Sequence, residues 1–356
     1  MSTAPNTLNS SSSTSGSAGN PAGGGPGRIA LMWAVTVLFT VVACAGIGEM
    51  AARLAHVRIF HARQPEYIGW AKPDPVLGWR NNPGVHRADE SPHEPMTFLA
   101  DGSRDSGTPA EATGRPVVII GCSFSEGYGV KDNQTFSWIL QQRFPHRPIL
   151  NFGTPGYGTY QSLLLLRELI EQRHVHPAAV VYGFIPFHAD RNVLTYKMLE
   201  AFRAFGGQRF SPPHVEVRDG ALQAFSPFVV ANWPLEEHSA LVTLLHRTEL
   251  RMKLANRERD DERVTLMLLS EMKDIVDKEH GRLLAATLWH GGPPGPAAYR
   301  RMADAMQAAG IEQMDVTYAG TETKPERLAV AGHGHPGPAI HEWWADKLSG
   351  WIENLR

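Results

Sequence analysis

Val117-Val-Ile-Ile-Gly-Cys-Ser-Phe-Ser-Glu-Gly-Tyr-Gly-Val130 is the stretch that decides the fold of this 356-residue chain. Its four β-branched residues at the start predict a strand buried on both faces, as in a parallel sheet. Gly121 ends the strand, and small or polar residues then turn the backbone. Residues 131–140 combine capping residues with spaced apolar ones and predict the next helix. Ser123 is therefore expected at the carboxyl end of a parallel strand, where open α/β sheets bind their ligands.

Strands and helices alternate through the rest of this domain. We expect further strands at 148–151, 178–182, 282–288 and 310–316, and helices at 160–173, 239–280 (broken near residue 260) and 297–309, with a closing helix from about residue 342. This alternation predicts a flavodoxin-like, doubly wound parallel sheet over residues 116–356. Residues 193–235 contain no clear periodic element, so we expect an insertion at about 193–260 that covers the site.

Ser123 has two interpretations. A serine at the end of a strand commonly caps the following helix. It can also be a nucleophile if a base lies nearby. The run is not Gly-x-Ser-x-Gly, because Ser125 occupies the second glycine position, and this argues against the nucleophile elbow of α/β-hydrolases.

Three blocks in order resemble the SGNH/GDSL hydrolase family. They are Gly121-Cys-Ser-Phe-Ser-Glu-Gly127, Asn151-Phe-Gly-Thr-Pro-Gly-Tyr-Gly158 and Gly334-His-Pro-Gly-Pro-Ala-Ile-His341. The resemblance implies an ester-cleaving enzyme in which Ser123 is the nucleophile and His335 the base. It also implies an oxyanion hole formed by the backbone N–H groups of Ser123 and Gly156.

The chain departs from the family pattern at three places. Cys122 replaces the Asp that precedes the nucleophile, and Phe187-His188 replaces the Asn-Asp of a further block. His188 or Asn192 would then be the third oxyanion donor. The Asp that should orient His335 is missing as well, and His333 or the remote Asp315 are the alternatives. If neither His333 nor Asp315 orients His335, the site is a Ser123–His335 dyad. We expect no metal, because the histidine-rich loop lacks a clear set of further ligands.

The amino-terminal part predicts a membrane anchor. Residues 1–28 have almost no bulky apolar residues and predict a disordered tail. Residues 29–50 form an apolar stretch of the length of one transmembrane helix. A cleaved signal peptide is the main alternative, which the long preceding tail disfavours. Lipidation at Cys44 is another, although the apolar pattern continues beyond that cysteine.

Residues 51–115 predict an extended juxtamembrane segment rich in proline, glycine and polar residues. They resemble the leader segments of membrane-anchored SGNH proteins of bacterial envelopes. Arg53, Arg58 and Arg63 follow the apolar stretch, which by charge alone would leave the domain in the cytoplasm. Large domains cross membranes largely regardless of such charges. From the resemblance we expect a single-pass inner-membrane protein with its domain on the periplasmic side.

Together these features predict a serine esterase or deacetylase without a cofactor. The substrate would be an acylated small molecule or carbohydrate of the envelope. The alternatives are a polysaccharide O-acyltransferase and an inactive binding protein of the same fold. A net charge of −2 with evenly mixed signs gives no indication of nucleic-acid binding.

Overall fold

The computed structural model describes residues 25–61, 70–87, 95–206, 212–291, 297–332 and 334–355. The chain divides into two compact units, one ending at Arg58 and the other running from Ile59 to Arg356. The larger unit contains the sheet and all the candidate site residues that the structure describes.

The first unit contains one long helix, α1, at Pro26–Leu54. Its mean hydropathy reaches 2.3 over an 18-residue window, and its length and composition are sufficient to cross a membrane. A helix of 29 residues extends about 43 Å, which exceeds the roughly 30 Å of a bilayer core. The helix begins three residues before the expected position, because proline is well suited to a first helical turn. Most of the tail expected at 1–28, up to residue 24, lies outside the described residues.

The second unit is built on a five-stranded sheet in which every pairing is parallel. Its order is β11 (Glu312–Asp315), β10 (Arg282–Thr287), β7 (Ala179–Phe184), β5 (Val117–Gly121) and β6 (Ile149–Asn151). If the strands are numbered by position in the chain and read from β6 to β11, this order is 2-1-3-4-5, the flavodoxin-like arrangement. The predicted fold class is therefore confirmed, and every residue of β5 is buried as its β-branched run indicated.

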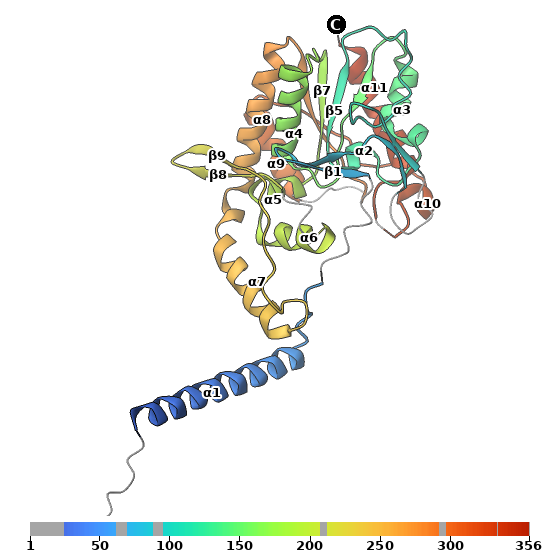
Figure 1. Ribbon diagram of the computed structural model, residues 1–356. Helices are drawn as coiled ribbons and strands as arrows, with labels where there is room; N and C mark the ends of the chain where they lie inside the picture. The colour runs from blue at the N-terminus through green and yellow to red at the C-terminus, as the bar shows by residue number, and fades with distance from the viewer. Residues whose placement is uncertain are drawn as a thin grey trace, which may run out of the picture. The chain divides into compact units, whose positions relative to one another are not determined.

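Helices cover both faces of the sheet (Figure 1). One face carries α3 (Phe136–Arg143) and the closing helix α11 (Pro338–Glu353), which pack together. The other carries α4 (Thr159–Arg167), α8 (Asp261–Lys278) and α9 (Ala297–Ala308). Helix α4 continues into a π-helical turn at Glu168–Gln172. The core thus lies in two layers, one on each side of the strands.

The segment before the sheet belongs to the same compact unit. It forms two antiparallel pairs, β1 (Ala71–Asp74) with β2 (Gly78–Asn81) and β3 (Gly84–Arg87) with β4 (Pro95–Phe98). Several of its apolar side chains are buried in the domain core, namely Trp70, Leu77, Trp79, Met96 and Phe98. The larger unit therefore starts near residue 59, well before residue 116.

Residues 193–235 contain regular structure that the sequence analysis missed. Helix α6 occupies Tyr196–Gly206, and β8 (His214–Arg218) pairs with β9 (Ala221–Phe225) in a hairpin. The Asp219-Gly220 turn of this hairpin has φ angles of 51° and 82°, which suit a tight hairpin turn. Helix α7 (Ala240–Leu254) and a 3-10 turn at Arg257–Arg259 then lead to α8, close to the expected break.

Three short helices complete the unit at the loops after the strands. They are α2 (Ser123–Glu126), α5 (Phe187–Val193) and α10 (Pro325–Leu328). Helices α2 and α5 directly follow the neighbouring strands β5 and β7, so their residues meet at the carboxyl edge of the sheet (Figure 1).

Candidate active site

Ser123 is the first residue of α2, two residues beyond the end of strand β5 at Gly121. The preceding Gly121 has a φ of 142°, and an added Cβ there would lie 2.3 Å from the Ser125 hydroxyl and 2.8 Å from the Gly183 carbonyl. Only glycine fits this turn, which places Ser123 at the edge of the sheet. Its N–H has no partner inside the helix, because it belongs to the first turn.

His335 lies against Ser123. The distance between the His335 Nε2 and Ser123 Oγ atoms is 3.0 Å. The histidine loop precedes α11 and is closed by a hydrogen bond from the Val330 N–H to the His335 carbonyl, 2.8 Å long. The ring of Tyr128 packs on the imidazole at a centroid distance of 4.8 Å. The Ser123 hydroxyl and the His335 imidazole are thus within reach for direct proton transfer.

Arg104 holds the loop that follows Ser123. Its buried guanidinium donates to the Gly127 and Val130 carbonyls, at 2.7 Å each, and to the Asp132 carboxylate at 2.8 Å. Asn151 holds the other end by donating to the Ser125 carbonyl at 2.9 Å. Charge-assisted bonds of this kind fix the backbone around the serine.

A cavity of about 350 Å³ opens beside the Ser123–His335 pair. Its walls are mostly aromatic and apolar, and they comprise Trp70, Trp79, Ser123, Tyr128, Pro155, Gly156, Arg191, Met198, Ala201, Phe202 and His335. Trp70 and Trp79 come from the segment before the sheet, whereas Met198 and Phe202 come from α6. The segment before the sheet and the insertion that was expected to cover the site therefore both line the cavity.

Of the four oxyanion candidates, the structure brings Ser123 and Gly156 to this cavity. Gly156 has a φ of 81°, and an added Cβ would lie 2.9 Å from the Trp79 ring. His188 and Asn192 are not among the residues that line the cavity. The Asn192 amide donates to the Thr159 and Thr265 hydroxyls, and its oxygen accepts from the Tyr160 N–H.

His188 lies in the protein interior instead. Its Nδ1 atom lies 2.5 Å from the Tyr182 hydroxyl oxygen, and its side chain is fully buried. Burial holds the pKa of His188 well below its ordinary value, so the ring is neutral at neutral pH. The oxyanion role suggested for His188 and Asn192 thus has no geometric support in this arrangement, because internal hydrogen bonds hold both side chains.

The groups suggested for orienting His335 differ in position. Asp315 is exposed at the end of β11, where its carboxylate accepts from the Thr317 N–H at 2.8 Å. His333 lies outside the described residues. The nearby His341 faces the core, where burial lowers its pKa to about 3. Within the described ranges, no group of three His, Cys, Asp or Glu side chains could hold a metal ion.

Comparisons with known proteins give weak likenesses only. No protein-family model and no curated protein matches the chain. Among solved structures, TesA is 14% identical with a TM-score of 0.41, covering 68% of this chain and 99% of TesA. A lipolytic G-D-S-L protein from Veillonella parvula is 11% identical with a TM-score of 0.34, covering 67% of this chain and 99% of its own.

A third solved structure is a variant of Axe2, an acetyl xylan esterase from Geobacillus stearothermophilus. It is 14% identical with a TM-score of 0.36, covering 69% of this chain and 97% of its own. At these values the likenesses do not establish an activity for this chain.

Two ionisable residues at or near the site escaped the sequence analysis. Arg191 lines the cavity and donates from Nη1 to the Tyr157 carbonyl at 2.9 Å. Glu126 lies three residues after Ser123, and both of its carboxylate oxygens are buried without a hydrogen-bond partner. Burial raises the pKa of Glu126 to about 8, although Arg104 opposes this shift. Only the fold reveals either environment.

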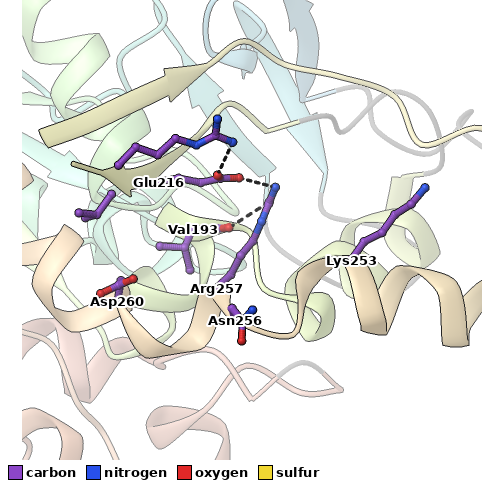
Figure 2. Close-up of a pocket in the computed structure, with 8 residues that line it drawn as sticks. Val193, Glu216, Lys253, Asn256, Arg257 and Asp260 are labelled. Carbon is purple, nitrogen blue, oxygen red and sulfur yellow. Dashed lines mark hydrogen bonds and ion pairs between the residues drawn. The ribbon is translucent and has the colours of Figure 1, made fainter. Parts of the chain in front are cut away.

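A second cavity of about 420 Å³ lies between the β8–β9 hairpin and the turn before α8. Figure 2 shows Arg257 bonded to Glu216 and to the Val193 carbonyl, at 2.7 and 3.2 Å. Arg218 also bonds Glu216, and Lys253 is paired with Glu249. The cations here are neutralised by carboxylates, and neither Ser123 nor His335 lines this cavity. The cavity beside Ser123 is therefore the candidate active site.

Proposed function

We propose that this chain is a serine-dependent ester hydrolase. The observation that carries the proposal is the 3.0 Å contact between His335 Nε2 and Ser123 Oγ at the mouth of an aromatic cavity. A serine hydroxyl is a weak nucleophile until an adjacent base accepts its proton. This contact supplies that base.

The reaction would proceed in two acyl-transfer steps. His335 accepts the Ser123 proton as Oγ attacks the ester carbonyl, and the Ser123 and Gly156 N–H groups stabilise the oxyanion. His335 then gives the proton to the departing alkoxide, which leaves as the alcohol. Water, activated by the same imidazole, attacks the acyl-serine and releases the acid. If a sugar hydroxyl replaces water, the same site is an O-acyltransferase.

The cavity favours acylated molecules with a flat or apolar surface. Trp70, Trp79 and Phe202 form part of its wall, and a mostly apolar lining with a few polar groups is typical of small-molecule sites. A small acyl ester of a carbohydrate or another small molecule fits this lining. We further propose that α1 anchors the chain in the inner membrane and that the catalytic unit lies on the periplasmic side.

Turnover of a small acetyl ester tests this proposal. Wild type should hydrolyse the ester. Ser123→Ala should lower the rate at least about a thousandfold, because the covalent route is lost. Ser125→Ala is the matched control, since this serine lies on the same short helix but does not line the cavity.

Adding an acetylated donor together with a sugar acceptor separates hydrolysis from transfer, because transfer yields an acetylated acceptor. If wild-type protein neither hydrolyses the ester nor transfers its acetyl group, a binding protein of the same fold is the remaining alternative.

A further inference from the structure

Arg191 brings an uncompensated positive charge to the candidate active site. It lines the same cavity as Ser123 and His335. Its Nη1 atom donates to the Tyr157 carbonyl, whereas its Nε is buried without a hydrogen-bond partner. In the part of the chain that the structure describes, no carboxylate pairs with Arg191. The other polar side chains that line the cavity are those of Ser123, Tyr128 and His335, and Ser123 and His335 contact each other.

Most other partly or fully buried arginines of this domain have acidic partners, whereas the half-buried Arg147 bonds the Leu355 carbonyl. Arg80 bonds Asp74 and Glu168, and Arg203 bonds Glu200 and Glu236. Arg104 pairs with Asp132. An unpaired charge in an apolar wall is costly because it loses its hydration. Such a cost persists at a functional site when a ligand supplies the missing partner.

The Arg191 charge also acts on the groups beneath it. It contributes to lowering the pKa of His188, after burial, and counteracts the rise in the pKa of Tyr182. Both effects have the sign expected of a nearby cation. Among the described residues that line the cavity, Arg191 alone is an arginine or lysine.

We propose that Arg191 binds a carboxylate carried by the alcohol part of the substrate, so that the site selects esters of anionic alcohols such as acylated acidic sugars. A guanidinium binds a carboxylate through charge-assisted hydrogen bonds, which are strong in a partly dehydrated cavity. This inference rests on the proposed ester hydrolase function. It adds a class of substrate and a residue that determines it.

Two esters of matched shape test the proposal, 4-acetoxybenzoate and its neutral amide analogue 4-acetoxybenzamide. Values of kcat/KM are measured for the full chain in detergent micelles and divided by the uncatalysed hydrolysis rates. Wild type should prefer the carboxylate, and Arg191→Gln should lower this preference roughly tenfold to a hundredfold, the range for a hydrogen bond to a charged group. Arg191→Lys should keep part of the preference, because it keeps the charge.

Two controls accompany the variants. Arg259→Gln makes the same change of charge at an exposed residue away from the cavity and should leave the preference unchanged. The preference of wild type should also weaken with added salt, as expected for an electrostatic contact. Thermal unfolding and circular dichroism show whether Arg191→Gln remains folded. If Arg191→Gln does not fold, the proposal is tested with Arg191→Lys and the salt series.

A binding measurement separates this inference from the proposed chemistry. Ser123→Ala protein is titrated with each ester by calorimetry, with and without Arg191→Gln. Tighter binding of the carboxylate that depends on Arg191 supports the inference even if wild type shows no turnover. Equal binding of both esters overturns it, even if wild type is an active esterase. An equal fall in kcat for both esters in Arg191→Gln also overturns it, because Arg191 would then stabilise the oxyanion.

Discussion

At the scale of single residues, the site combines groups that the sequence identifies with groups that only the fold reveals. Ser123, Gly156 and His335 stand in short blocks whose order predicted a common site, and the structure brings all three to one cavity. Arg191 and Glu126 stand in no such block. Their environment depends on burial and on contacts with distant segments, which a single sequence does not show.

The buried Glu126 predicts a pH dependence of stability. Its pKa in the folded chain, about 8, lies above its ordinary value of 4.5. The folded state therefore binds more protons between these values, and the free energy of unfolding falls as the pH rises from about 4.5 to 8. By linkage, Glu126 alone should lower the free energy of unfolding by on the order of 3 kcal/mol at pH 7 relative to pH 4.

Glu126→Gln should remove this component. Chemical denaturation of wild type and variant is measured from pH 4 to 8, and the difference between the two curves isolates the group. We expect the variant to gain stability relative to wild type as the pH rises. Parallel curves would show that Glu126 has an ordinary pKa in the folded chain.

At the scale of elements, the alternation of strands and helices was sufficient to predict the sheet, because the apolar runs at 117–120, 178–182 and 282–288 have strand length and each ends at a turn. Helix α6 was missed although Met198, Leu199 and Phe202 have helical spacing and are buried. The flanking glycines and scattered aromatic residues hid this short pattern. The place of Trp70 and Trp79 in the cavity follows from long-range contacts, which a single sequence does not show.

The turn at Gly156 lies against the Trp79 ring and lines the cavity. Gly156→Ala should destabilise the fold by about 1–3 kcal/mol, because alanine is strained at positive φ and its Cβ would press on Trp79. It should also lower ester turnover by deforming the cavity. Gly310→Ala is the matched control, since Gly310 has a φ of 70° but nothing within 4 Å of an added Cβ. Equal effects of the two substitutions on turnover would contradict a role for the Gly156 turn.

At the scale of the whole molecule, the chain comprises an apolar helix and a larger compact unit that starts near Ile59. A chain starting at Ile59 should therefore be soluble and unfold cooperatively. A chain starting at residue 116 should not, because it lacks Trp70, Leu77, Trp79, Met96 and Phe98, each fully buried apolar side chain contributing about 1.5–3 kcal/mol. Thermal unfolding of the two chains distinguishes these cases. Cooperative unfolding of the shorter chain would contradict this boundary.

The proposed membrane topology is tested separately. Alkaline phosphatase, which folds only outside the cytoplasm, is fused after Arg356. An active fusion agrees with a periplasmic catalytic unit, and a paired fusion to a cytoplasmic reporter should be inactive. The reverse pattern would place the unit in the cytoplasm, as the arginines that follow the apolar stretch suggest on their own.

The central claim, that Ser123 is a nucleophile activated by His335, is tested most directly by labelling with a fluorophosphonate. Peptide mass spectrometry of labelled wild type should find the adduct on Ser123. Ser123→Ala should take up no label, and His335→Ala should react far more slowly, because the base no longer accepts the proton. An adduct on another serine, or undiminished labelling of Ser123→Ala, would contradict the account.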